Sequence, residues 1–151
     1  MIENIYGDKE WYLNGNLHRE DGPAIERVNG YKAWYQNNKL HREDGPAIES
    51  ANIYKAWYIN GKLHRKNGPA IEYTNGYNEW LINGKHHRID GPAIEFVNGY
   101  KEWYLGGKKM TEEEFNTYWK MKKETCKTIY DCEIKSINND ISNLITSFLY
   151  Y

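Results

Sequence analysis

Histidine and arginine recur in this chain in one fixed context, the phrase HRxxGPAIE. Histidine supplies metal ligands and general bases near neutral pH, and arginine beside glutamate is typical of anion sites and acid–base pairs. The phrase contains His18, His41, His64 and His87, followed by Arg19, Arg42, Arg65 and Arg88, and it ends in Glu26, Glu49, Glu72 and Glu95. A catalytic centre needs one unique cluster, whereas these residues occur in four copies. The repetition therefore favours a structural role.

The expected distance between successive histidines is too long for two of them to bind one metal ion. Two β-strands per copy would advance a sheet by roughly 10 Å, while a zinc–nitrogen bond is about 2.1 Å long. We expect each imidazole to stack on a tryptophan across a hairpin, and each arginine to form a cross-strand ion pair with its glutamate. No nucleophile or phosphate loop stands out, so we expect no catalytic residue, no metal and no cofactor. Cys126 and Cys132 are too widely spaced for a CxxC redox motif and are expected to be idle thiols.

Tryptophan marks a strict period along most of the chain. The tryptophans of this ladder are Trp11, Trp34, Trp57, Trp80 and Trp103, each 23 residues after the one before. A fixed period of this size indicates one supersecondary unit stacked on copies of itself. We predict an all-β repeat array, an antiparallel β-hairpin solenoid or extended single sheet, over residues 1–110. Residues 111–151 lie outside the repeats and are predicted to form a C-terminal α-helical cap.

Each unit carries two turn signals, of which the first follows the tryptophan. Asn-Gly between β-prone runs is the strongest short signal of a hairpin with a two-residue loop. Around Asn60-Gly61 such a loop places Trp57 opposite His64.

The second turn signal precedes the tyrosine of each unit. Around Asn75-Gly76 a two-residue loop places Ile71 opposite Trp80. Rows of Ile, Trp and His would then share one face of the sheet, and Ala, Tyr, Leu, Glu and Arg the other. Asn52-Ile53 breaks the pattern in the third unit and predicts a distorted turn there.

The phrase HRxxGPAIE joins one hairpin to the next, and two arrangements are open. A tight reversal would give three strands per unit, and every second unit would then be flipped. A kink within one long strand would give two strands per unit and keep all copies equivalent, which suits such uniform sequences. We favour the kink, because glycine allows unusual backbone angles and proline removes one ladder donor.

The alternation of NGK-x-H with an aromatic Y-x-x-W segment resembles the MORN repeat, whose pattern is roughly Y-x-G-x-W-x-x-G-x-x-x-G. The pattern falls on Tyr31, Trp34 and His41, on Tyr54, Trp57, Gly61 and His64, and on Tyr77, Trp80, Gly84 and His87. The resemblance implies an extended hairpin array that acts as a scaffold or contacts proteins and lipids. The chain departs from the family at Ala33, Ala56 and Glu79, where glycine is usual. The repeated sequence of this chain is similar to a MORN-like variant common in giant DNA viruses, and this resemblance implies a viral protein.

The residues after the array predict helices. Thr111 and Glu114 form a capping box, and Phe115, Tyr118, Trp119 and Met121 follow at spacings suited to one helical face. A second helix is predicted to begin near residues 139–140, with an apolar stripe from Ile141 to Leu149. The helices either cover the last strands or join two copies in a homodimer, which light scattering of the full-length chain would detect.

Net charge and mean hydropathy limit the classes of partner that the chain is expected to bind. The net charge is −1 and the mean hydropathy is −0.91, so neither nucleic acid nor an anionic membrane surface is favoured, and no apolar run is long enough to span a bilayer. The N-terminus lacks a secretory signature, so a cytoplasmic location is expected, in the host cell or virion if the source is viral.

We therefore expect a non-enzymatic scaffold for protein–protein interaction. The alternatives are a peripheral lipid-headgroup-binding module, by analogy with MORN proteins, or a structural assembly protein. Exposed tyrosine and arginine are favoured at binding surfaces. The candidate binding face comprises Tyr12, Tyr35, Tyr58 and Tyr104 with Arg42, Arg65 and Arg88.

Overall fold

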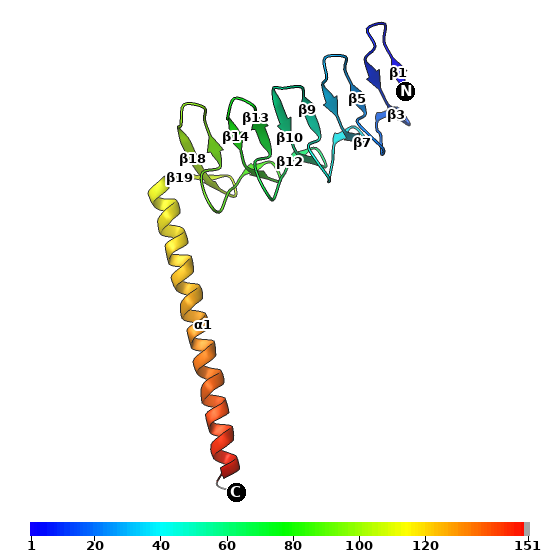
Figure 1. Cartoon of the computed structure of the whole chain (residues 1–151). Helices are drawn as coiled ribbons and strands as arrows, with labels where there is room; N and C mark the ends of the chain where they lie inside the picture. Colours follow the sequence, from blue (N-terminus) through cyan, green and yellow to red (C-terminus); the bar gives the residue numbers. More distant parts are fainter. Residues whose placement is uncertain (150–151) are drawn as a thin grey trace. The chain divides into compact units, whose positions relative to one another are not determined.

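Two hairpins of different size make up each 23-residue unit in the computed structural model, which describes the backbone of residues 1–149 and the side chains of residues 1–139. The larger hairpins stand side by side in chain order and form one antiparallel sheet of 11 strands, while the smaller hairpins form a parallel row of their own (Figure 1). The sheet begins with β1 and ends with β19 and does not close on itself. The predicted class, an open antiparallel hairpin array, is therefore confirmed.

The large sheet takes two strands from each complete unit and runs in chain order. Its strands are β1 (Ile2–Glu3), β2 (Lys9–Glu10), β5 (Ile25–Glu26), β6 (Lys32–Ala33), β9 (Ile48–Ser50), β10 (Tyr54–Ala56), β13 (Ile71–Tyr73), β14 (Asn78–Glu79), β17 (Ile94–Glu95), β18 (Lys101–Leu105) and β19 (Lys108–Met110). The small hairpins pair β3 (Tyr12–Leu13) with β4 (Asn16–Leu17), β7 (Tyr35–Gln36) with β8 (Lys39–Leu40), β11 (Tyr58–Ile59) with β12 (Lys62–Leu63), and β15 (Leu81–Ile82) with β16 (Lys85–His86).

Tryptophan is the branch point between the two hairpins of a unit. The Trp34 backbone N–H donates to the Ala47 carbonyl at 2.8 Å, which ties β6 to the next unit. The Trp34 carbonyl accepts from the His41 N–H at 3.0 Å, which closes the small hairpin of its own unit. The same two bonds recur at Trp11, Trp57 and Trp80. The chain therefore bends at each of these tryptophans, and the Asp-Gly-Pro segment forms the loop that returns it to the large sheet.

The choice between two and three strands per unit is settled by the order of the large sheet. β5 and β6 pair with each other, and β6 then pairs with β9 of the following unit. Each unit advances the sheet by two strands, so all copies keep the same orientation and meet the same surroundings. Two strands per unit in the sheet are therefore confirmed. The predicted kink within one long strand is wrong, because β12 and β13 on either side of the HRxxGPAIE segment belong to different sheets and the tryptophan segment folds into a separate small hairpin.

The small hairpins have the predicted register. Tyr58 pairs with Leu63 around the Asn60-Gly61 turn. Asn60 and Gly61 have φ angles of 50° and 78°. Positive φ at both central residues defines the type I′ turn, whose twist matches that of the flanking strands. Asn37 and Asn38 take the same conformation without glycine, with φ of 50° and 61°, because asparagine tolerates the left-handed region.

The large hairpins have a different register from the predicted one. Ile71 pairs with Glu79 and not with Trp80, and the Tyr73 N–H donates to the Tyr77 carbonyl at 2.9 Å. The loop therefore has three residues, with only Gly76 at positive φ (93°). The side chain of Asn75 accepts a bond from the Tyr77 N–H at 3.0 Å. This local bond stabilises the three-residue form of the loop.

A shift of one residue reverses the face to which a strand's side chains point. Ile48 faces Ala33 on one side and Ala56 on the other, so isoleucine shares a face with alanine and not with tryptophan. Tyr35 and Tyr58 pack against this same cluster. The predicted rows of Ile, Trp and His on one face are wrong for isoleucine, and the apolar core lies on the Ile, Ala, Tyr and Leu face.

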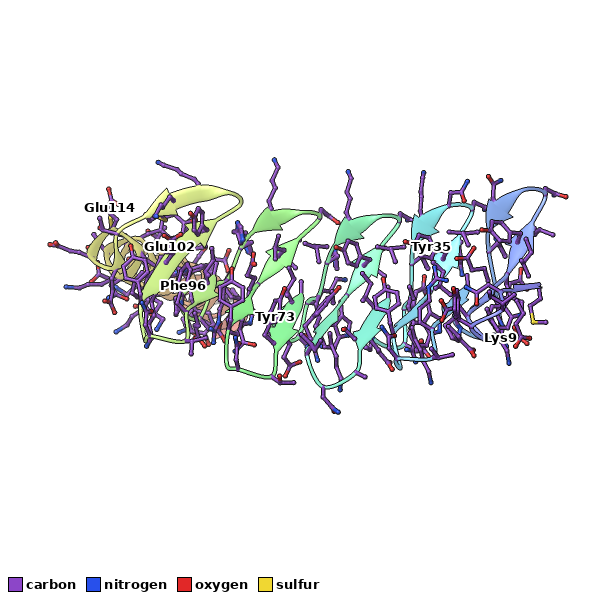
Figure 2. The ribbon with its side chains drawn as sticks, turned by 90° about the horizontal axis from the view of Figure 1, so that it is seen from above. Lys9, Tyr35, Tyr73, Phe96, Glu102 and Glu114 are labelled. Atoms are coloured by element: carbon purple, nitrogen blue, oxygen red, sulfur yellow. The ribbon has the colours of Figure 1, made fainter. Side chains whose placement is uncertain are left out.

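Alanine dominates the buried core. Among the described side chains of the array, the buried apolar residues are Ala24, Ala33, Ala47, Ile48, Ala56, Ala70, Leu81, Ala93 and Ile94. Small side chains let neighbouring hairpins approach closely, and the larger tyrosines cover them from outside. Figure 2 shows the units in succession from Lys9 in the first to Glu102 in the last, with Tyr35 and Tyr73 between them.

The third unit has the distorted turn that its sequence predicts. Asn52, and not the following residue, takes the positive φ of 56°. Ile53 stands where the other units have glycine, and a β-branched residue is strained in the left-handed region. The Ile53 carbonyl accepts from the Thr74 N–H at 2.9 Å, so this turn is also tied to the next unit.

The C-terminal segment is one helix, α1 (Glu112–Leu149), and not two. The chain divides into two units at this point, Met1–Thr111 and the segment that begins at Glu112. The predicted break near residues 139–140 is wrong, because the helix continues through Asn138, Asn139 and Asp140, each of which lowers helix stability by only about 0.7 kcal/mol. The predicted apolar stripe from Ile141 onward lies outside the residues whose side chains are described.

Candidate functional site

The guanidinium group of the arginine in each repeated phrase lies over the ring of a tryptophan. The Arg42 guanidinium carbon is 4.0 Å from the centre of the Trp34 ring. The corresponding distances are 4.1 Å for Arg19 on Trp11, 3.7 Å for Arg65 on Trp57 and 3.9 Å for Arg88 on Trp80. Guanidinium groups at such distances are attracted to the negative face of the indole. Arginine therefore takes the stacking position on tryptophan that was expected for histidine.

Each arginine is held on its other edges by its own loop. Arg42 contacts Asp44 at 2.8 Å, the Pro46 carbonyl at 3.2 Å and Glu49 at 3.0 Å. Each arginine also pairs with the glutamate seven residues later in its own phrase, at 3.2, 3.0, 3.5 and 2.9 Å. The expected arginine–glutamate ion pairs are therefore present, but they form within one phrase and not across strands. The third copy has Asn67 in place of the aspartate and lacks that contact. These arginines are consequently part of the loop framework and their charge is already partnered.

Histidine links neighbouring units through the small hairpins. Nδ1 of His41 accepts the backbone N–H of Asn60, the first turn residue of the next unit, at 3.2 Å. The equivalent bonds join His18 to Asn37 at 3.2 Å, His64 to Asn83 at 3.3 Å and His87 to Gly106 at 2.9 Å. The ladder histidines thus bind the backbone of the following turn. Among the side chains of residues 1–139, no three potential metal ligands of the His, Cys, Asp and Glu types come together.

The tyrosines and arginines of the candidate binding face are not on one face. Side chains alternate along a strand, so Trp34 and Tyr35 point to opposite sides of the small hairpin. Arg42 follows Trp34, whereas Tyr35 packs against the core cluster around Ala33. Tyr58 is placed like Tyr35, and Arg65 and Arg88 are placed like Arg42. Tyr12 and Tyr104 each donate a hydrogen bond to the glutamate two residues earlier, at 2.5 and 2.9 Å.

A polar group on the core face of the last two units was not predicted from the sequence. Glu79 and Glu102 stand where the second and third units have Ala33 and Ala56. Glu79 accepts from the Tyr77 hydroxyl at 2.6 Å and contacts Nε2 of His86 at 2.6 Å. Glu102 accepts from the Lys109 ammonium at 2.6 Å.

The repeat contains a signal for this group. In the second and third units the alanine is accompanied by Leu40 or Leu63, and in the fourth and fifth units the glutamate is accompanied by His86 or Lys109. In these four units the two positions change together, whereas the first unit combines Glu10 with Leu17, so the exchange is a partial signal of the contact. Burial and the Glu79 carboxylate raise the pKa of Tyr77, so this hydroxyl stays a donor.

We expect Glu102→Gln to change how stability depends on pH. The bonds from Lys109 and then Tyr104 lower the pKa of Glu102 below its value of 4.5 in the unfolded chain. A lowered carboxyl pKa stabilises the fold above the unfolded pKa, and the stabilisation is lost as the pH falls through the folded pKa. Urea midpoints of the two proteins should therefore differ most at pH 6 to 7 and converge as the pH is lowered toward 3. A constant difference across this range would contradict the assignment.

Three similar grooves follow one another on the tryptophan face. Groove A lies between the first and second HRxxG loops beside Trp34 and Gln36, groove B between the second and third beside Trp57 and Ile59, and groove C between the third and fourth beside Trp80 and Ile82. Their volumes are about 710, 530 and 560 Å³. All three are half-open depressions formed by equivalent residues, and they recur once per unit.

The third residue of each HRxxG loop varies more than the other residues of the loop. Glu20 and Glu43 project from the first two loops with 87% and 84% of their side chains exposed. The equivalent residues in the third and fourth loops are Lys66 and Ile89. Groove A is therefore flanked by Glu20 and Glu43, whereas groove C has Lys66 and Ile89 at the equivalent positions, together with Asp90. The row thus offers one repeated shape with a charge that changes along it.

The part of the chain that the structure describes contains no helix that is both long and apolar enough to cross a bilayer. No family model, no curated protein and no solved structure matches the chain. The structure itself shows a regular β-hairpin repeat protein with one C-terminal helix.

Proposed function

We propose that this protein is a non-enzymatic, MORN-like repeat scaffold that binds partner proteins along grooves A, B and C. The observation that carries the proposal is the recurrence of one groove shape at three successive junctions between loops. A row of equivalent sites lets several weak contacts act together, and an extended segment bound to the row gains affinity from each of them. Repeat proteins commonly use such extended surfaces for binding.

The arginine and histidine side chains are already bonded within the protein, which supports a scaffold rather than an enzyme. Each arginine of the loops is held by tryptophan, a proline carbonyl and glutamate, and each ladder histidine by a backbone N–H. Bonds of this kind order the repeat. They also shield the groups from a substrate, which would have to break an internal bond to use them.

The charge along the row indicates the chemistry of the partner. Glu20 and Glu43 project beside groove A, so a cationic side chain is favoured there. Ile82 and Ile89 line groove C, so an apolar side chain is favoured at that end. Complementary charges would set the direction in which a segment binds and would exclude acidic partners.

Selection from a random peptide library against the full-length chain tests this proposal. We expect enriched peptides to carry Lys or Arg near one end and to lose about tenfold in affinity for the Glu43→Lys variant, which reverses a charge that no internal ion pair with arginine requires. Glu112→Lys, at an exposed helix residue outside the row, serves as the matched control and should bind like the parent. Enrichment that ignores Glu43→Lys, or no enrichment at all, would exclude the grooves as the binding surface.

The lipid-headgroup alternative makes a different prediction for the same protein. Anionic vesicles would be repelled by the carboxylates of Glu20, Asp21, Glu43 and Asp44 that flank groove A. We therefore expect no co-sedimentation with anionic vesicles at physiological ionic strength. Pelleting with such vesicles would favour the lipid alternative over the protein scaffold.

A further inference from the structure

The spacing of the grooves sets a length scale that a ligand must match. Each groove belongs to one junction between units, and each unit advances the large sheet by two strands. Neighbouring strands are about 4.8 Å apart, so consecutive grooves repeat at about 9.6 Å. A polypeptide lying along the row can fill all three grooves only if its side chains point the same way at this interval.

Regular backbone conformations differ in whether they meet this condition. In a β-strand, side chains on one face recur at about 6.7 Å and residues three apart point to opposite faces. In an α-helix, the nearest equivalent residues are seven apart at about 10.5 Å, which accumulates a mismatch of about 1.8 Å over two intervals. The polyproline II helix has three residues per turn and a rise of about 3.1 Å, so every third residue recurs at about 9.3 Å. Its mismatch over the row is about 0.6 Å.

The chemistry of the grooves agrees with the geometry. Trp34, Trp57 and Trp80 line grooves A, B and C respectively. Grooves lined by aromatic side chains are the common docking surface for proline-rich segments, because the polyproline II helix is preformed and loses little conformational entropy on binding. The exposed carboxylates at groove A and the isoleucines at groove C add a requirement for a cationic residue at one end and an apolar residue at the other.

We propose that grooves A, B and C bind a proline-rich segment in the polyproline II conformation, with side chains i, i+3 and i+6 in successive grooves. Residue i is Arg or Lys beside Glu20 and Glu43, and residues i+3 and i+6 are apolar and contact Ile59 and Ile82. This inference rests on the proposed scaffold function and names the class of partner that the scaffold takes.

Synthetic peptides of one composition separate the register from mere affinity for proline. Each fluorescent peptide carries one Arg, two Leu and prolines, with the three anchors spaced either three or four residues apart and with the Arg at either end. Fluorescence anisotropy with the full-length chain measures the dissociation constants. We expect the better of the two period-three peptides to bind at least about tenfold more tightly than either period-four peptide.

A matched pair of variants locates the binding. Ile59→Glu places a carboxylate in groove B and should weaken the period-three peptide by about tenfold. Ile53→Glu makes the same change at a turn of the large hairpin, outside grooves A, B and C, and should leave affinity within about twofold. Circular dichroism confirms that both variants fold, and Glu43→Lys provides a second groove variant if Ile59→Glu does not.

The possible negative results have different meanings. Equal binding of period-three and period-four peptides, or equal effects of Ile59→Glu and Ile53→Glu, would overturn the polyproline II inference. Library-selected peptides that depend on Glu43 yet lack the three-residue period would overturn it as well, while the scaffold proposal would stand. If no selected peptide depends on Glu43, both proposals fail.

Discussion

Trp57→Ala should lower the free energy of unfolding by about 2–4 kcal/mol, the largest loss that we expect from one substitution in the array. Removing a large aromatic side chain from a packed site costs about 3–5 kcal/mol when the site is fully buried, and Trp57 is half-buried. The Arg65 guanidinium, 3.7 Å from the centre of the indole, would also lose its stacking partner. The effect should be measured as a shift of the urea midpoint followed by circular dichroism.

Glu49→Ala is the comparison for this prediction. Glu49 forms an ion pair with Arg42 at 3.0 Å, but 36% of its side chain is exposed. Ion pairs in such solvent-screened positions contribute about 0.2–1 kcal/mol, so the variant should lose less than about 1 kcal/mol. Units of a repeat array can unfold in steps, so the midpoints of the two variants are the quantities to compare. An equal or reversed order would show that the tryptophan ladder does not dominate stability.

Gly45→Ala should destabilise the array by about 1–3 kcal/mol through a side-chain collision. A Cβ atom at residue 45 would lie 2.8 Å from the guanidinium carbon of Arg42, and overpacking of a fixed group costs energy of this size. The guanidinium cannot move aside cheaply, because Trp34, Asp44 and the Pro46 carbonyl hold it. The glycine is thus required by the space that it leaves, since its φ is not in the left-handed region.

A double-mutant cycle isolates this contact. In an Arg42→Ala background the guanidinium is gone, so Gly45→Ala should cost close to nothing or stabilise slightly by reducing the entropy of the unfolded chain. The four urea midpoints give the coupling energy. Additive effects of the two substitutions would mean that the glycine serves another purpose.

The fold could be predicted from the sequence wherever a single local signal decides it. Asn60-Gly61 is such a signal, because both residues take positive φ and the two-residue turn fixes the pairing of Tyr58 with Leu63. The constant interval between tryptophans likewise determines that the units stack as equivalent copies. In both cases the information lies within a few residues or in an exact repetition.

The register of the large hairpins could not be predicted in the same way. Asn75-Gly76 has the same two residues as the small turn, yet the Asn75 side chain accepts the Tyr77 N–H and the loop takes three residues. Both loops are compatible with the dipeptide, and the packing of Ile71 against the neighbouring alanines decides between them. A single extra loop residue then moves isoleucine to the other face.

The candidate site could not be predicted for a similar reason, because tertiary contacts decide which side chain contacts the tryptophan. Histidine and arginine are adjacent in every phrase, and either could reach the tryptophan. The loop positions its aspartate, proline carbonyl and glutamate around the arginine, as at Arg42, and this arrangement leaves His41 to bind the next turn. The grooves exist only between successive units, so no one phrase contains them.

The branch at each tryptophan carries a consequence for evolution of the molecule. A closed barrel must keep a set number of strands, but here the chain enters and leaves every module at the same place and in the same direction. Duplication or loss of one 23-residue module in the gene would leave all remaining junctions unchanged. The length of the array can therefore change by whole modules without changes elsewhere in the protein.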